Sequence, residues 1–218
     1  MKETGTMEIL ADLKHKRHYR DLREEAKKGY NKLLTQEISN KVRAEVYRNL
    51  AKIARDENDY GCAEELINAG LQLKNIRKDK RDMLTLSLAE LYTFQLRDYN
   101  KAIKLYLTLQ KGTAYPNIKA KIGLGNARYT DRDHQSNACW YLEALRVLGD
   151  HGDIELRAQA LIGLGNARYT DRDHQSDAYW YLEALDLLRD HGDIELRAQA
   201  LIGLGNARYI DRDHQSDA

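Results

Sequence analysis

An internal repeat of forty residues is the feature that most restricts how this 218-residue chain can fold. Residues 122–161 and 162–201 differ at only five of forty positions, and 202–218 starts a third copy with Ile210 in place of Thr170. A fixed period in the range of roughly 20–50 residues is typical of solenoids, propellers and other repeat arrays. Copies this similar indicate recent duplication or design, so identity between them does not by itself mark a functional residue.

Each unit has the pattern of two helices joined by a polar turn. Asp153 precedes the first helix, and an aspartate there can accept hydrogen bonds from the free N–H groups of the first turn. Apolar residues follow at helical spacing over 154–167 and again over 178–188, with the polar segment 170–176 between them. Gly192 suits a helix C-terminal cap, and Asp193 begins the next unit. Because two helices cannot bury both apolar faces alone, we expect the units to stack.

The first half of the chain follows the same plan more loosely. Residues 47–73 and 85–109 each contain two apolar helical patterns separated by an Asp-Tyr turn, and a basic connector, 74–81, lies between them. Earlier apolar residues, such as Ile9, Leu13, Leu22 and Tyr30, predict a degenerate pair of capping helices. We therefore predict an all-α protein folded as a right-handed α-solenoid of helix–turn–helix repeats. The expected divisions are capping helices at 1–40, units at about 41–75, 82–111, 116–150 and 153–190, and a half repeat at 193–218.

Charge and cysteine content narrow the class of protein. Residues 1–120 carry 24 basic and 17 acidic side chains, whereas 121–218 carry 11 and 17, so the first half is basic and the second acidic. The longest stretch without charge, 158–167, is shorter than the ~20 residues that a membrane span requires. Two cysteines, Cys62 and Cys139, are too few for a disulfide or metal framework. These features predict a cytoplasmic protein that does not enter a membrane.

Motifs of catalysis and cofactor binding are incomplete in this sequence. The glycine pattern at 163–168 begins like a dinucleotide fingerprint but lacks the third glycine and follows no strand. The repeated Asp-Arg-Asp-His segments, for example 171–174, offer too few ligands for zinc and suit helix capping. Cys139 is replaced by Tyr179 in the next copy, so the repeat does not depend on a thiol. We predict a protein that is not an enzyme and that holds no cofactor or metal.

Several short motifs resemble the tetratricopeptide (TPR) repeat. They are 164–167 (Leu-Gly-Asn-Ala), 181–185 (Tyr-Leu-Glu-Ala-Leu), and, in the first half, Leu50-Ala51, Asp59-Tyr60, Ala63 and Gly70-Leu71. The forty-residue spacing, the Leu-Gly-Asn triplet and the Gly-Asp connector are most similar to the longer repeats of the Pins/LGN and kinesin-light-chain type. Arg168, where an aromatic residue is usual, and Ala178, one place late, depart from the pattern. The resemblance covers about 41–218 and implies a superhelix whose first helices line a concave groove.

Glycines inside the first helices indicate close contact between helices. Gly163 and Gly165 lie within one helical pattern, and each costs ~1 kcal/mol of helix stability relative to alanine. Close approach of a neighbouring helix is the obvious compensation. We predict that contact at Ala51, Gly125, Gly165 and Gly205.

The candidate binding residues come from the resemblance, which implies that the asparagine of the triplet binds the backbone of an extended peptide. An asparagine amide carries both an acceptor and donors, so it can bind peptide C=O and N–H groups together. The competing interpretation is that asparagine merely tolerates an exposed position. The candidates on the expected concave face are Asn126, Asn166 and Asn206, Tyr129, Tyr169 and Tyr209, and Ile122, Ile162 and Ile202.

The predicted function is a non-catalytic scaffold or adaptor that binds a peptide segment of another protein. One alternative is a nucleic-acid or phosphate-binding protein that uses the basic residues near Lys14–Arg17 and the connector 74–81, although interleaved acidic residues also suit a solvated helix face. The other is a purely structural or self-assembling array, natural or engineered. The half repeat at 193–218 predicts either a fragment of a longer array or end-to-end docking onto another copy.

Overall fold

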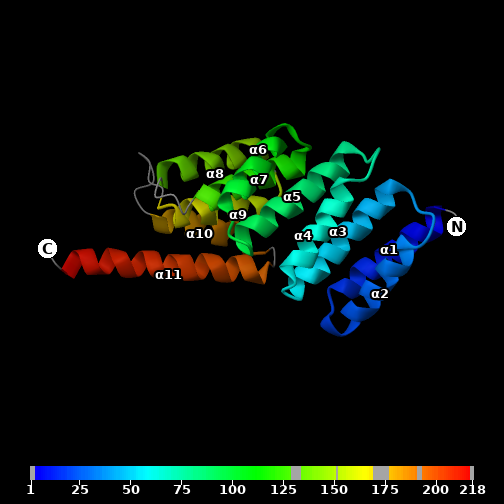
Figure 1. Ribbon diagram of the computed structural model, residues 1–218. Helices are drawn as coiled ribbons and strands as arrows, with labels where there is room; N and C mark the ends of the chain where they lie inside the picture. The colour runs from blue at the N-terminus through cyan, green and yellow to red at the C-terminus, as the bar shows by residue number, and fades with distance from the viewer. Residues whose placement is uncertain (1–2, 129–133, 151, 169–176, 191–192, 217–218) are drawn as a thin grey trace. The chain divides into compact units, whose positions relative to one another are not determined.

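The computed structural model describes residues 3–128, 134–150, 152–168, 177–190 and 193–216. In those ranges the regular structure consists of eleven α-helices and two short 3-10 helices, with no strand (Figure 1). The prediction of an all-α protein is therefore confirmed. The chain divides into two compact units, 1–105 and 106–218, and the division falls within α6 (Tyr99–Thr108).

The first unit begins with two helices that pack on a third. Leu13, Tyr30 and Leu33 are buried together with Val46 and Ile53 of the third helix, so one core runs across residue 40. Two residues of the predicted apolar pattern, Ile9 and Leu22, are exposed instead. These elements are α1 (Glu3–Arg17), a 3-10 turn at Arg20–Leu22, α2 (Arg23–Leu34) and α3 (Asn40–Asp56).

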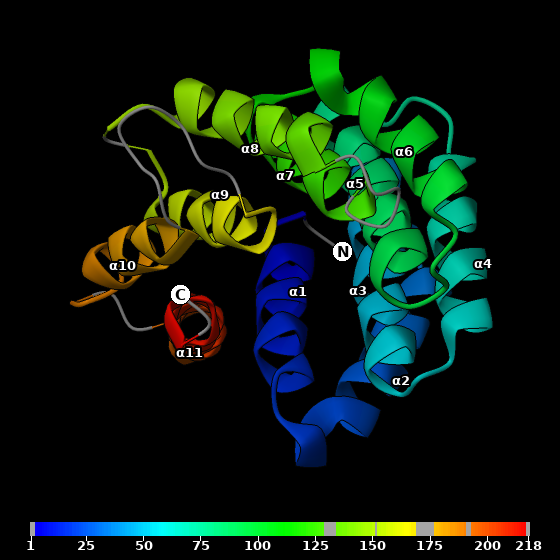
Figure 2. The ribbon, with the colours of Figure 1, turned by 90° about the vertical axis from the view of Figure 1, so that its left-hand side faces the viewer.

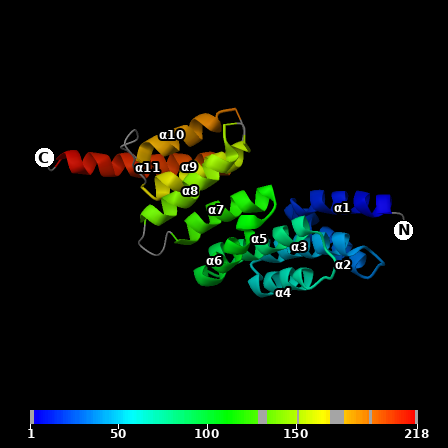
Figure 3. The same cartoon turned by 90° about the horizontal axis from the view of Figure 1, so that it is seen from above.

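The rest of the first unit consists of α4 (Tyr60–Leu71) and α5 (Lys78–Phe94), and α3 packs against both of them (Figure 3). Side-chain caps define where two of these helices begin. The Ser39 hydroxyl accepts from the Val42 N–H at 3.5 Å, and the Asp59 carboxylate accepts from the Cys62 N–H at 3.1 Å. Because α5 begins at Lys78, the second half of the predicted connector 74–81 is the first turn of a helix.

The second unit consists of helices that each pack against the next one along the chain. In addition, α9 contacts both α7 and α11, so the first helices of successive repeats also touch (Figure 2). This neighbour-to-neighbour packing is the arrangement that stacked repeats require. After a 3-10 turn at Leu109–Lys111, the elements are α7 (Ala114–Arg128), α8 (His134–Leu148), α9 (Ile154–Asn166), α10 (Asp177–Leu187) and α11 (Ile194–Ser216).

The predicted caps of the repeat are present. Asp153 and Asp193 each accept a hydrogen bond at 2.9 Å, from the N–H groups of Leu156 and Leu196 respectively. Gly192 lies outside the described residues. The aspartates therefore fix the start of the first helix in both copies.

The third copy of the repeat differs from the second in its backbone. In the second copy α9 ends at Asn166, and Arg168 adopts a left-handed conformation with φ +50°. In the third copy α11 continues as one helix to Ser216, through the residues that correspond to the polar turn. The polar segment therefore does not end the first helix in this half repeat, although its sequence differs from that of the second copy only at Ile210.

Candidate functional site

Two of the three predicted asparagines lie near the C-terminal ends of first helices, and each is bound by a tyrosine of the following helix. The Tyr141 hydroxyl donates to Asn126 Oδ1 at 2.7 Å, and the Tyr181 hydroxyl donates to Asn166 Oδ1 at 2.9 Å. In this arrangement the amide oxygen of each asparagine faces the tyrosine hydroxyl. Asn166 is exposed, so its Nδ2 group has a defined direction and access to solvent.

Glycines make room for these tyrosine rings. A Cβ added at Gly125 would lie 2.5 Å from the Tyr141 ring, and one added at Gly165 would lie 2.6 Å from the Tyr181 ring. Real Cβ atoms essentially never approach other atoms so closely. On their other side the same two rings meet Gly163 and Gly203 of the next repeat. We call each arrangement, a tyrosine between two glycines with its hydroxyl on an asparagine, a tyrosine lock.

The tyrosine lock explains the helix-weakening glycines of the sequence. At Gly125 and Gly165 the neighbouring helix does approach closely, as predicted, and the contacting group is an aromatic ring. At Gly205 no atom of the described residues lies within 4 Å of an added Cβ, so the contact predicted there is not seen. Each of these glycines lowers the stability of its own helix. Burial of the large tyrosine side chain that the glycine admits offsets this cost.

The isoleucines of the predicted concave face do not form an open surface. Ile122 and Ile162 are only 4% and 5% exposed and belong to the core of the second unit, whereas Ile202 is 65% exposed. The prediction that Ile122 and Ile162 line a groove is therefore wrong, because side chains that are buried in the core cannot contact a peptide. Asn206 lies exposed in α11.

The side chains of the three tyrosines predicted for the concave face lie outside what the structure describes. Tyr129 and Tyr169 lie outside the described residues. Tyr209 belongs to α11, but only its backbone is described. These three residues remain predictions.

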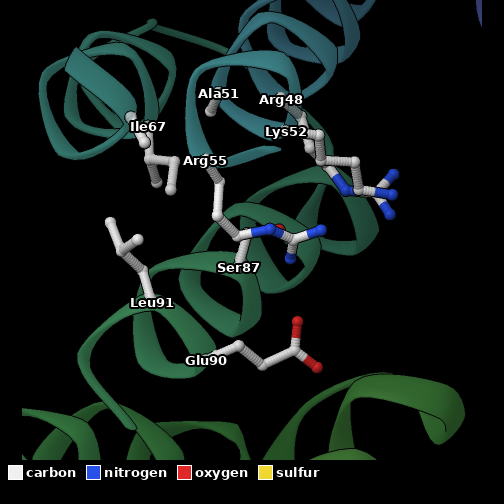
Figure 4. Close-up of a pocket in the computed structure, with 9 residues that line it drawn as sticks. Arg48, Ala51, Lys52, Arg55, Ile67, Ser87, Glu90 and Leu91 are labelled. Atoms are coloured by element: carbon white, nitrogen blue, oxygen red, sulfur yellow. The ribbon is translucent and has the colours of Figure 1, made fainter. Parts of the chain in front are cut away.

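The first unit contains a pocket lined by cationic side chains, which the sequence interpretation did not single out. Arg48, Lys52 and Arg55 lie at helical spacing along one side of α3, with their charged ends on one side of the pocket and apolar side chains on the other (Figure 4). Glu90 is the one acidic residue in the lining. The remaining lining residues are Ala51, Ala63, Ile67, Ser87 and Leu91.

Lys52 is the least compensated of these cations. Burial, together with the neighbouring charges of Arg48, Arg17 and Arg55, lowers its pKa to about 8, against an opposing effect of Glu90. The Nε groups of Arg48 and Arg17 are buried without a hydrogen-bond acceptor among the described residues. Arg48 contacts Glu45 at 3.5 Å and Arg55 contacts Asp56 at 3.3 Å. Lys52 is therefore the cation of the pocket that would gain most from a bound anion.

Three of the basic residues that the sequence did single out, Lys14, Lys16 and Lys80, are already paired. Lys14 and Lys80 both contact the buried Glu45, at 3.0 and 2.6 Å, and Lys16 contacts Glu25 at 2.7 Å. Burial alone would raise the pKa of Glu45, but the hydrogen bonds from Lys80 and Lys14 hold it at about 2. These lysines therefore already have acidic partners within the protein.

The described residues contain no group of three or more His, Cys, Asp or Glu side chains arranged to hold a metal ion. Residues 171–173 and the turn 131–133 lie outside the described residues. Within the part of the chain that the structure describes, no helix is both long enough and apolar enough to cross a bilayer. Neither a protein-family model nor a curated protein matches this chain.

Proposed function

We propose that the protein is a non-catalytic scaffold, a right-handed superhelix of TPR-like repeats that binds an extended peptide segment of another protein. The observation that carries this proposal is the pair of hydrogen bonds that orient Asn126 and Asn166 in the same way in successive repeats. An asparagine Nδ2 group can donate to a peptide carbonyl, and Oδ1 has a second lone pair for a peptide N–H.

The repeat spacing supports an extended ligand. Helices pack at about 8–10 Å, and an extended chain advances about 3.3 Å per residue, so successive asparagines match every third residue of a peptide. The two cysteines are free thiols, which suits a reducing compartment such as the cytoplasm, where we propose that the adaptor acts.

The test removes the donor and keeps the tyrosine lock. Asn126→Asp combined with Asn166→Asp preserves an oxygen acceptor for Tyr141 and Tyr181 but removes both Nδ2 groups. Peptides selected from a random display library on the native protein should bind the double variant about tenfold more weakly or worse, since two hydrogen bonds of about 0.5–1.5 kcal/mol each are lost.

The matched control changes a paired residue of the other compact unit. Lys16→Met removes a lysine that is bound to Glu25 in the first unit, and it should leave the selected peptides bound as tightly as before. Unchanged peptide affinity in the aspartate double variant would refute the proposal.

A second function, anion binding by the first unit, is favoured by the pocket of Arg48, Lys52 and Arg55. Phosphate groups and carboxylates are the ligands that such clustered cations recognise. Titration with inorganic phosphate should therefore give binding that weakens with salt and is lost in Lys52→Met but kept in Lys27→Met, because Lys27 is already bound to Glu57 at 2.7 Å.

The pH dependence of that binding has a definite sign. Lys52 carries its proton below its pKa of about 8 and loses it above. Phosphate affinity should fall as pH rises through about 8, and binding an anion should raise the pKa of Lys52 in a lysine titration monitored by NMR. A flat pH profile between pH 7 and 9 would exclude Lys52 from the site.

A further inference from the structure

Lys52 differs from the other partly buried lysines of the first unit in what surrounds its ammonium group. Among the described residues of that unit five lysines are partly buried, and four of them contact a carboxylate within 3.0 Å. These four are Lys14, Lys16, Lys27 and Lys80. The fifth is Lys52, which lines the cationic pocket and has no ion-pair partner in the part of the chain that the structure describes.

Like charges stand where a carboxylate partner is missing. Arg48 lies four residues before Lys52 and Arg55 three residues after it, so the three side chains share one side of α3 (Figure 4). Arg17, at the end of α1, adds a further positive charge, and Glu90 of α5 is the acid that opposes them. Burial and like charge both favour the neutral amine over the ammonium ion.

A neutral lysine amine is a nucleophile, because its lone pair is not held by a proton. With its pKa at about 8, Lys52 is neutral in about a fifth of molecules near pH 7.4, compared with about one in a thousand for an ordinary lysine. The pKa of Lys27 is instead raised, because Glu57 accepts a hydrogen bond from its ammonium group. Lys52 therefore combines a reactive amine with a place in an open pocket.

The two arginines beside this amine can hold an anion next to it. A guanidinium group stays protonated at a pH where Lys52 does not. Arg48 contacts Glu45 at 3.5 Å and Arg55 contacts Asp56 at 3.3 Å, and a guanidinium has five N–H donors, so donors remain. The Nε group of Arg48 is buried without an acceptor among the described residues. A phosphate group, with two charges and several acceptor oxygens, matches such a pair of arginines.

We propose that Lys52 binds a small aldehyde that carries a phosphate group, and that it does so covalently, as an imine. This inference rests on the anion binding proposed above for the same pocket. The phosphate binds to Arg48 and Arg55, and the carbon skeleton packs on the apolar side of the lining, at Ile67 and Leu91. Nζ forms a bond to the carbonyl carbon, the two amine hydrogens leave with the carbonyl oxygen as water, and a C=N double bond remains.

Pyridoxal 5′-phosphate, which carries both an aldehyde and a phosphate group, is the probe. It is added to the full chain at about pH 7.5, sodium borohydride reduces the imines to stable amines, and mass mapping of peptides locates them; Lys52 should be modified at least about tenfold more than Lys27. Pyridoxal has the same aldehyde without the phosphate, and it should modify Lys52 about tenfold less. Inorganic phosphate should compete with the phosphate ester only.

The matched variant, Lys52→Arg, separates the amine from the charge. It keeps a cation in the pocket but cannot form this imine. It should bind inorganic phosphate within about threefold of the native affinity, while the imine absorbance of the probe is lost. Lys27→Met removes a lysine that is bound to Glu57, and this variant should keep both the phosphate affinity and the imine absorbance.

The outcomes separate this inference from the anion binding on which it rests. Selective modification of Lys52 that needs the phosphate group and is lost in Lys52→Arg supports the imine. If phosphate binds but the probe modifies Lys27 as much as Lys52, or if pyridoxal modifies Lys52 as strongly as its phosphate ester does, the imine proposal is overturned and anion binding stands. If inorganic phosphate neither binds nor competes, both proposals fail.

Discussion

The helices α9 and α11 allow a comparison in which the sequence is held constant over thirteen residues and the packing changes. In α9 the ring of Tyr181 rests on Gly165, and the helix ends at Asn166. In α11 no ring from the part of the chain that the structure describes rests on Gly205, and the helix continues to Ser216. Beyond the shared segment, the third copy differs from the second in 202–218 only by Ile210 in place of Thr170.

This difference teaches that the end of the first helix is decided by tertiary packing more than by local sequence. The residues after Asn206 match those after Asn166 except at Ile210, and they have ordinary helix propensity and are helical to Ser216. Where α10 packs on α9, Arg168 instead takes a left-handed conformation, which is unfavourable for a residue with a side chain. The contacts of the tyrosine lock are the observed interaction that can offset this cost.

The largest expected effect follows from removing a locking tyrosine. Tyr181→Ala deletes a ring that is 4% exposed and packed against two helices, and it should lower the free energy of unfolding by about 3–5 kcal/mol. Leu182→Ala, one residue along on the exposed side of α10, should change it by no more than about 0.5 kcal/mol. Similar losses for the two variants in urea titrations would contradict the lock.

Equivalent isoleucines provide the next contrast. Ile162→Ala should destabilise by about 2–5 kcal/mol because its side chain is buried in the core, whereas the same change at Ile202 should be close to neutral. Thermal unfolding followed by circular dichroism measures both. If Ile202→Ala proved as costly as Ile162→Ala, the face of α11 would have to be covered in solution.

A smaller effect isolates the hydrogen bond of the lock. Tyr181→Phe keeps the ring between Gly165 and Gly203 and removes the hydroxyl that donates to Asn166. The free energy of unfolding should fall by about 0.5–1.5 kcal/mol. In Asn166→Asp, which retains the acceptor, the loss should be smaller. A Tyr181→Phe variant as stable as the native chain would show that only the ring contributes.

Much of the fold could be predicted from the sequence because its signals are local. The aspartate caps and the apolar spacing predict where helices begin, and the glycines predict close contact between them. The burial of Ile122 and Ile162 could not be predicted in the same way. Helical spacing places Ile162 and Asn166 on neighbouring parts of one helix surface, but the position of the adjacent helices decides which of them is covered.

The cationic pocket was missed for a related reason. Runs of basic residues drew attention to Lys14–Arg17 and 74–81, where acidic partners neutralise the charge. Arg48, Lys52 and Arg55 form no run, and they come together only because residues four and three apart share a helix face. Counting charge around the α3 helix, instead of along the chain, would have found them.

Leucine substitution at the two equivalent glycines is the most direct test of the tyrosine lock. Equilibrium unfolding of Gly165→Leu and Gly205→Leu compares the same change in the same sequence, with the ring present at one site and absent at the other. The account predicts that Gly165→Leu lowers the free energy of unfolding by about 1–3 kcal/mol through overpacking. It predicts that Gly205→Leu leaves it unchanged or raises it by up to about 1 kcal/mol through helix propensity. Equal effects at the two glycines would contradict it.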